Sequence, residues 1–232
     1  MTTLLLLGSA PMALQATTWP RPPFDRIVAI NNAWRIRPDW DDCIYPWDFP
    51  EDRRPTASFN QRLITQDHFV PAQNAFGGFV YAGGTMAFTA AYWALHDYRP
   101  QTLAVFGCDM HYPASGPTHF YGQGTPDPLR SDITLRSLEA KSARLMILAA
   151  LQGTAMANLS TGPSRLVFPR ATAATLPDRP APFNARLAAE AQQCEAALNY
   201  HSPSGRYWEE ADRFDPAEID ALDALWRAAA NP

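Results

Sequence analysis

Short continuous runs of apolar residues alternate along the chain with segments of helical periodicity. The clearest runs lie at residues 4–7, 26–30 and 102–106, with shorter ones at 155–159 and 42–45. Each is about as long as a strand, and an apolar run of this kind is typical of a parallel strand covered on both faces. Their alternation with helical segments predicts an α/β fold with a Rossmann-like, mostly parallel sheet flanked by helices.

Four longer segments carry apolar residues at the spacing expected of helices. They cover residues 85–97, 135–152, 183–200 and 216–230. The last follows Asp215-Pro216, a pair typical of a helix N-terminus, and a shorter helical stretch at 12–18 is expected between the first two strands. Segments 38–62 and 160–182 show no sustained periodicity and are predicted to be mainly irregular.

The chain length indicates how these elements divide into domains. At 232 residues the chain is long enough for one sizeable domain with an appendage. We expect a main Rossmann-like domain over residues 1–170. Residues 171–232 are expected to form a linker and a C-terminal helical appendage that packs on the main domain.

Composition and charge exclude several classes of protein. The formal net charge is −4 and there is no basic run, so a nucleic-acid partner is not expected. The three cysteines lack CxxC spacing, which argues against a disulfide framework or a zinc knuckle and fits a reducing compartment. The apolar run at 4–7 is too short for a membrane span and lacks the basic residues of a signal peptide. We therefore expect a cytoplasmic protein without a membrane span.

Polar or glycine-bearing turns follow three of the predicted strands, and another leads into a helix. They are Gly8-Ser9-Ala10-Pro11, Asn31-Asn32, Gly107-Cys108-Asp109 and, before the helix, Gly83-Gly84-Thr85. The carboxyl ends of parallel strands meet at one edge of a sheet, and helix N-termini attract anions. We therefore expect these turns to form one anion-binding cleft. None has the GxGxxG or GK[ST] spacing, so the common dinucleotide and ATPase sites are not expected.

A histidine-containing loop follows the third of these turns. Histidine is the natural proton acceptor near neutral pH, and His119 shares this loop with Thr118 and Tyr121, downstream of Asp109. Together with His111, Asp109 and His119 have the carboxylate and imidazole groups that many metals bind. Because aspartate and histidine residues in such a loop often serve roles other than metal binding, we do not expect a metal site here.

The order of these segments resembles that in the bacterial lipooligosaccharide sialyltransferases. The related superfamily includes MptE-like pterin pyrophosphokinases and flagellin-modifying accessory proteins. The resemblance is carried, in order, by Gly8 to Pro11, Ala29 to Trp34, Ala82 to Ala87, Leu103 to Tyr112, Thr118 to Gly122, and Asn158-Leu159-Ser160. It covers the chain from about Leu4 to Arg170 and leaves out the C-terminal helices.

The resemblance implies a metal-independent glycosyltransferase that takes a nucleotide-sugar donor, such as CMP-sialic acid, and needs no further cofactor. The acceptor would be a glycan or a small molecule. The residues implied to bind the nucleotide are Gly8, Ser9, Pro11, Asn31, Asn32, Gly83, Gly84, Thr85, Asn158 and Ser160. The implied catalytic residues are His119 as the base, Tyr121 beside the departing phosphate, and Asp109.

Two positions depart from the sialyltransferase pattern. Gln123 stands where that pattern places its histidine, and Ser9 replaces the usual asparagine. One alternative within the superfamily is a pyrophosphate-transferring enzyme, which would need Mg²⁺ and several carboxylates. Another is a nucleotide- or partner-binding protein that has lost catalysis, with Trp34, Trp40 and Trp47 exposed for a partner. The C-terminal helices would cover an acceptor site or form the interface of a homo-oligomer.

Overall fold

The computed structural model describes residues 2–113, 115–123 and 130–231. Within these residues, six strands form one sheet in the order β4-β3-β2-β1-β5-β6, and every neighbouring pair is parallel. The strands are β1 (Thr3–Leu7), β2 (Arg26–Ile30), β3 (Asp42–Ile44), β4 (Arg62–Ile64), β5 (Thr102–Phe106) and β6 (Ala155–Asn158). The α/β fold with a parallel sheet is therefore confirmed.

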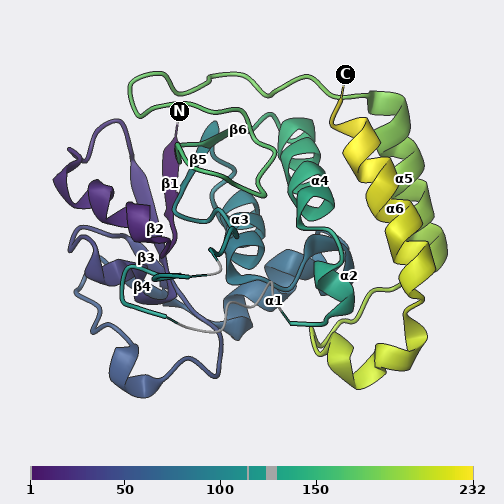
Figure 1. Ribbon diagram of the computed structural model, residues 1–232, viewed down its shortest axis with the longest axis horizontal. Helices are drawn as coiled ribbons and strands as arrows, with labels where there is room; N and C mark the ends of the chain where they lie inside the picture. Colours follow the sequence, from purple (N-terminus) through teal and green to yellow (C-terminus); the bar gives the residue numbers. More distant parts are fainter. Residues whose placement is uncertain (1, 114, 124–129, 232) are drawn as a thin grey trace.

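Helices cover the sheet and extend beyond it on one side (Figure 1). The α-helices are α1 (Gln66–Asn74), α2 (Phe79–Ala82), α3 (Met86–Asp97), α4 (Leu138–Leu151), α5 (Ala185–Leu198) and α6 (Pro216–Ala229). Short 3₁₀ helices cover Pro11–Thr18, Asn31–Arg35, Glu51–Arg53, Ile133–Leu135 and Tyr207–Arg213. None of the helices in the described part of the chain is both long and apolar enough to cross a bilayer.

The sheet separates two apolar cores, which explains why its central strands contain continuous apolar runs. Leu4 and Leu6 of β1 face the core that is formed with the α-helices. Leu5 and Leu7 face the opposite core, which the 3₁₀ helices Pro11–Thr18 and Asn31–Arg35 cover. Side chains alternate between the two faces along a strand, so a strand buried on both sides needs apolar residues at every position.

The strand order changes direction at β1. The chain builds β2, β3 and β4 outward on one side of β1 and then returns to place β5 on the other side. The turns that follow β1 and β5 therefore diverge from adjacent strands, and this is the point where open α/β sheets bind ligands. Gly8 makes this junction tight, because its N–H donates to the Phe106 carbonyl at 2.8 Å. A Cβ on Gly8 would lie 2.3 Å from the Gly107 carbonyl oxygen.

Strand β4 and helix α1 are among the elements that were not predicted from the sequence. Strand β4 is three residues long and pairs with β3, and α1 follows it in the segment after the predicted loop. Helix α1 contains Pro71, which weakens the local helical signal, and it starts with a capping box between Thr65 and His68. Helix α4 also begins later than predicted, because Ser137 caps it after a separate 3₁₀ turn.

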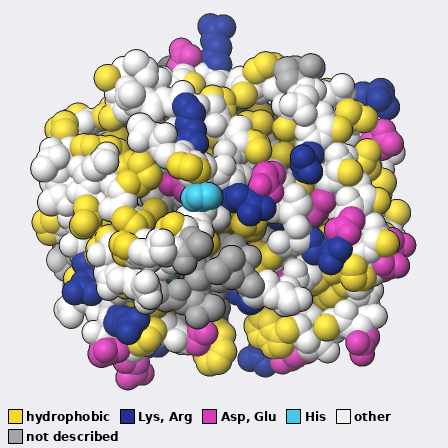
Figure 2. Space-filling model, viewed as in Figure 1, with side chains coloured by type: hydrophobic (Ala, Val, Ile, Leu, Met, Phe, Trp, Pro, Cys, Tyr) yellow, Lys and Arg dark blue, Asp and Glu magenta, His cyan; other side chains and the backbone are white. Residues whose placement is uncertain are grey.

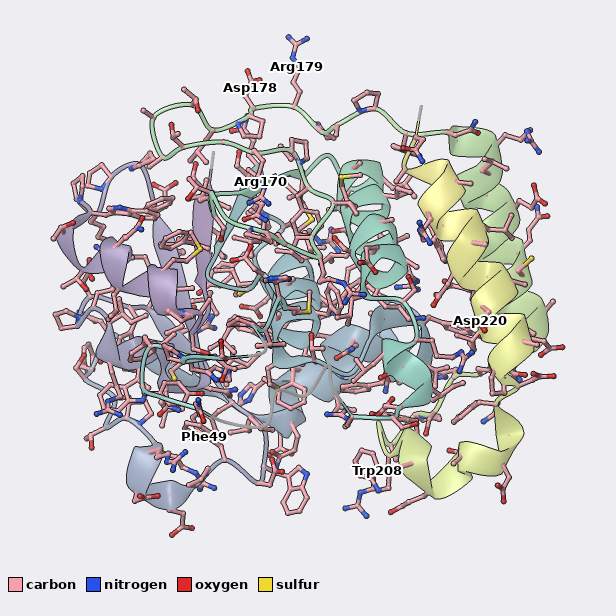
Figure 3. The ribbon with its side chains drawn as sticks, in the orientation of Figure 1. Phe49, Arg170, Asp178, Arg179, Trp208 and Asp220 are labelled. Carbon is pink, nitrogen blue, oxygen red and sulfur yellow. The ribbon has the colours of Figure 1, made fainter. Side chains whose placement is uncertain are left out.

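Helices α5 and α6 form an outer layer against α4 (Figure 1). A buried ion pair joins the layers, with Lys141 Nζ 2.8 Å from Asp223 Oδ1. Asp220 of α6, labelled in Figure 3, pairs with Arg136 at the surface. The linker to α5 crosses the amino-terminal edge of the sheet, where the Thr102 hydroxyl donates to the Pro177 carbonyl at 2.9 Å. Acidic and basic side chains are interspersed over the face drawn in Figure 2.

Candidate functional site

A cavity of about 490 Å³ lies at the carboxyl edge of the sheet, around the junction of β1 and β5. Its walls come from the turns after β1, β2 and β5, from the first residues of α3, from Arg53, and from the loop that carries His119. The predicted site residues that line it are Gly8, Ser9, Asn31, Asn32, Thr85, Asp109, His119 and Tyr121. Segments that are far apart in the sequence thus meet in one cleft, as the strand-end pattern predicted.

The first turn of α3 reaches the cavity through Thr85, Met86 and Ala87. Thr85 is the N-cap, and its hydroxyl oxygen accepts a hydrogen bond from Phe88 N–H at 3.3 Å. The same hydroxyl donates to the Met110 sulfur at 3.7 Å, which joins the helix start to the turn after β5. The amides of Met86 and Ala87 precede the first intrahelical hydrogen bond and lie at the positive end of the helix dipole.

Gly83 and Gly84, which we predicted to contact the nucleotide, are not among the residues that line the cavity, whereas Thr85 beside them is. Gly84 N–H donates to the Thr134 hydroxyl at 3.0 Å, and a Cβ on Gly84 would lie 2.7 Å from that oxygen. Gly83 has φ +92° and packs against Phe88. These glycines allow the turn before α3 to pack closely against its neighbours. They therefore position Thr85, which does line the cavity.

Pro11, Asn158 and Ser160 also lie outside the lining. Pro11 begins the exposed 3₁₀ helix after β1, where proline is favoured at the first helical position. Asn158 and Ser160 instead hold Asp109: the Ser160 hydroxyl donates to Oδ2 at 2.6 Å and Asn158 Nδ2 donates to Oδ1 at 3.4 Å. The structure therefore places this pair behind the cavity wall, in contact with Asp109.

Asp109 is only 5% exposed, although it lines the cavity. Its two carboxylate oxygens accept hydrogen bonds from the last residue of β6, Asn158, and from Ser160 just after the strand. Its backbone carbonyl accepts a further bond from Arg165 N–H at 2.9 Å. This arrangement fits a residue that positions the turn after β5, and the catalytic role that we predicted for Asp109 stays a prediction.

His119 is held in place by its neighbours at the cavity wall. The Thr118 hydroxyl lies 2.9 Å from Nδ1, and the imidazole stacks on Tyr121 with ring centroids 5.0 Å apart. The ring of Tyr112 lies on its other side, with centroids 6.0 Å apart. Phe120 N–H donates to the Ser9 carbonyl at 3.0 Å, which fastens the loop to the end of β1. Gln123, which stands at the histidine position of the family pattern, lines the same cavity.

Asn31 and Asn32 bring two amide groups to the cavity. Asn31 has φ +51°, a left-handed conformation that asparagine tolerates better than most residues. Among the described residues, the Oδ1 atoms of both side chains are buried and have no hydrogen-bond partner. Asn32 is only 2% exposed. Buried polar atoms without partners are uncommon in folded proteins, so they are expected where a ligand binds.

Arg35 and Arg53 line the cavity and were not identified from the sequence. Arg35 ends the 3₁₀ helix that begins with Asn31. Because it follows Asn31-Asn32 so closely in the sequence, it could have been predicted to lie near the same cavity. Arg53 ends a different 3₁₀ helix in the connection between β3 and β4, and nothing in its local sequence indicates the cavity. The indole N–H of Trp34 donates to the Arg53 carbonyl at 3.0 Å and joins the two segments.

Two other features limit the chemistry of the site. Burial raises the pKa of the Cys108 thiol well above its usual range, and the charge of Asp109 acts in the same direction, so Cys108 stays protonated.

In the part of the chain that the structure describes, no group of three or more His, Cys, Asp or Glu residues is arranged to hold a metal ion. His111 lines the cavity but is not part of such a group.

The tryptophans are less exposed than predicted. Trp40 is buried and Trp34 is partly buried, which leaves Trp47 as the exposed member of the three, at 67%. The buried rings belong to the core on the 3₁₀-helix side of the sheet.

The sequence matches no protein-family model, and comparisons with curated proteins and with solved structures gave no significant match. The function is therefore inferred from the residues of the cavity.

Proposed function

We propose that the protein transfers a glycosyl group from a nucleotide-sugar donor to a hydroxyl group, with the donor bound in the cavity at the junction of β1 and β5. The position of this cavity carries the proposal: it lies at the strand switch point, and the loop with His119 is fastened to the end of β1. Its volume of about 490 Å³ is within the usual range for small-molecule sites.

The residues of the cavity suit a donor that carries phosphate. The N–H groups at the start of α3 offer hydrogen-bond donors and a partial positive charge to a phosphate oxygen. Asn31 and Asn32 offer amide groups to the hydroxyls or the base of a nucleoside. The stacked rings of His119 and Tyr121 form an aromatic wall for a sugar or base.

Displacement at the anomeric carbon needs a base for the acceptor and stabilisation of the leaving phosphate. In the proposed reaction, His119 accepts the proton of the acceptor hydroxyl as its oxygen forms the new bond to the anomeric carbon. The bond from that carbon to the phosphate oxygen breaks, and the nucleotide leaves with the electron pair. Tyr121 and the amides of α3 would stabilise the charge that develops on the phosphate.

Binding is tested by titrating the full chain with nucleoside mono- and diphosphates, without added metal, in calorimetry and thermal-shift experiments. At least one of them should bind and raise the melting temperature. The failure of every nucleotide to bind would overturn the proposal. Binding without transfer to any acceptor would favour a protein that has lost catalysis.

The role of His119 is tested by H119A, with H96A as the matched control because His96 is exposed on α3. H119A should lower turnover by about 100- to 10,000-fold with nucleotide affinity nearly unchanged. H96A should behave like the wild type. Turnover by H119A at the wild-type rate would remove His119 from the base role.

A pyrophosphate-transferring reaction has less support in this cavity. It would need several carboxylates to hold Mg²⁺. Among the described residues of the lining, Asp109 is the only carboxylate, and both of its oxygens already accept hydrogen bonds.

A further inference from the structure

Arg35 and Arg53 differ from most basic residues of this protein in their charge environment. Most of the arginines in the described part of the chain lie within 4.0 Å of a carboxylate, as in the pairs of Arg37 with Asp39 and Arg144 with Glu195. No such ion pair involves Arg35 or Arg53 among the described residues, although both line the cavity. Two guanidinium groups without a carboxylate partner at one cavity attract an anion.

The local structure holds the backbones of the two arginines together. The hydrogen bond from Trp34 Nε1 to the Arg53 carbonyl joins the residue next to Arg35 directly to Arg53. The 3₁₀ helix of Arg53 begins with two acidic residues, Glu51 and Asp52, and Glu51 pairs with Arg54 at 3.8 Å. Arg54 Nε in turn donates to the Phe49 carbonyl at 3.0 Å.

The arginines and the histidine reach the cavity from different segments of the chain. Arg35 follows β2, and Arg53 lies in the connection from β3 to β4. His119 instead belongs to the loop that is fastened to the end of β1, through the bond from Phe120 to Ser9. The lining of the cavity thus combines Arg35 and Arg53, from segments that follow β2 and β3, with His119, from a loop that follows β5 in the chain.

An independent observation indicates a ligand next to Arg35. Asn31 and Asn32 begin the same 3₁₀ helix that Arg35 ends. Their Oδ1 atoms are buried without a hydrogen-bond partner among the described residues, and Asn32 is almost fully buried. Arg35 and two amide oxygens that lack a hydrogen-bond donor, such as a hydroxyl or a base N–H of a ligand, thus lie on one short helix at the cavity wall.

We propose that Arg35 and Arg53 bind an oxyanion of the donor at the part of the cavity wall that the segments after β2 and β3 form, and so fix the direction in which the donor lies. The anion is a phosphate or a sugar carboxylate, both of which the fork of a guanidinium can bind through two hydrogen bonds. This inference rests on the proposed function for the identity of the ligand, but anion binding by the two arginines can be measured without turnover.

The test uses the variants R35Q, R53Q and R35Q/R53Q of the full chain. Arg35 and Arg53 are exposed, so their replacement should leave the fold intact. R179Q is the matched control, because Arg179 is also exposed but lies at the opposite edge of the sheet (Figure 3). The probes are CMP, cytidine, inorganic pyrophosphate and glucuronate, measured by calorimetry and thermal shift at two salt concentrations.

We expect CMP to bind the wild type and R179Q equally, and each arginine replacement to weaken CMP by about tenfold or more. Cytidine, which lacks the phosphate, should be affected much less, and the salt dependence of CMP binding should fall in the double variant. R35K and R53K should restore only part of the affinity, because lysine keeps the charge without the planar fork.

The base-free probes identify the anion. Stabilisation by pyrophosphate that is lost in R35Q/R53Q assigns the arginines to a phosphate, and the same pattern with glucuronate assigns them to a sugar carboxylate. Equal CMP affinities for the wild type and the double variant would overturn the inference, as would a wild type that responds to none of the anions. Arginine-dependent binding of pyrophosphate without glycosyl transfer would instead contradict the proposed function alone.

Discussion

The hydroxyl of Ser160 donates a hydrogen bond of 2.6 Å to Oδ2 of Asp109, and this bond joins the ends of β6 and β5 behind the cavity. Both residues are almost completely buried. A buried carboxylate oxygen that loses its hydrogen-bond donor lowers the stability of the folded protein. The pair is therefore important for the stability of the turn after β5.

S160A should therefore lower the free energy of unfolding by about 1–3 kcal/mol, measured by urea denaturation. S131A is the control, since Ser131 is exposed, and it should change stability by less than about 0.5 kcal/mol. An S160A protein as stable as the wild type would show that Asp109 does not depend on this bond.

G8A should be among the most destabilising single substitutions in the chain. The new Cβ would lie 2.3 Å from the Gly107 carbonyl oxygen and 2.5 Å from the Cys108 sulfur, and the backbone oxygen cannot move without separating β1 from β5. We expect a loss of about 3 kcal/mol or more, measured by chemical denaturation. G162A is the matched control, because nothing lies within 4 Å of a Cβ at that position. Similar stabilities of G8A and G162A would contradict the close contact.

The ion pair of Lys141 and Asp223 should be sensitive to the loss of one partner and tolerant of the loss of both. Both side chains are buried, and burial raises the pKa of Asp223 even though Lys141 opposes the shift. K141M should cost about 3–5 kcal/mol, whereas K141M/D223L should be close to the wild type in denaturant unfolding. The exposed pair of Arg186 and Glu190 is the control, and R186A should change stability by less than about 1 kcal/mol. Equal destabilisation by K141M and by the double variant would contradict this account.

Asp132 should stabilise the fold in a pH-dependent way. Burial tends to raise its pKa, but hydrogen bonds from Thr134, Tyr207 and Arg130 outweigh burial and lower it below 3.8. Because the folded-state pKa is depressed, the stabilisation is fully present above the unfolded pKa and is lost as the pH falls through the folded value. D132N should thus cost about 2 kcal/mol at pH 7, and the difference should shrink below about pH 4 in unfolding measurements. A difference that stays constant from pH 7 to pH 3 would show that the charge of Asp132 does not contribute.

The elements that the sequence predicted well are those with a strong local signal. The runs at 4–7 and 103–106 are apolar at every position, as is typical of a strand buried on both faces. The Asp215 side chain accepts a hydrogen bond from Ala217 N–H at 2.7 Å, as expected of the capping residue of α6. Strand β4 has no comparable signal, because three residues become a strand only by pairing with β3.

The sequence by itself determined that the turns after β1, β2 and β5 meet at one edge, because parallel strands present their carboxyl ends together. Ser9, Asn31 and Asp109 could be assigned to the cavity on that ground. Only the tertiary structure decided which turn residues face the cavity: Gly84 faces Thr134, and Ser160 faces Asp109. The tertiary structure also places Arg53 at the cavity, because the connection from β3 to β4 packs against Trp34. Such contacts form between residues that are distant in the sequence, so they cannot be predicted from local sequence patterns.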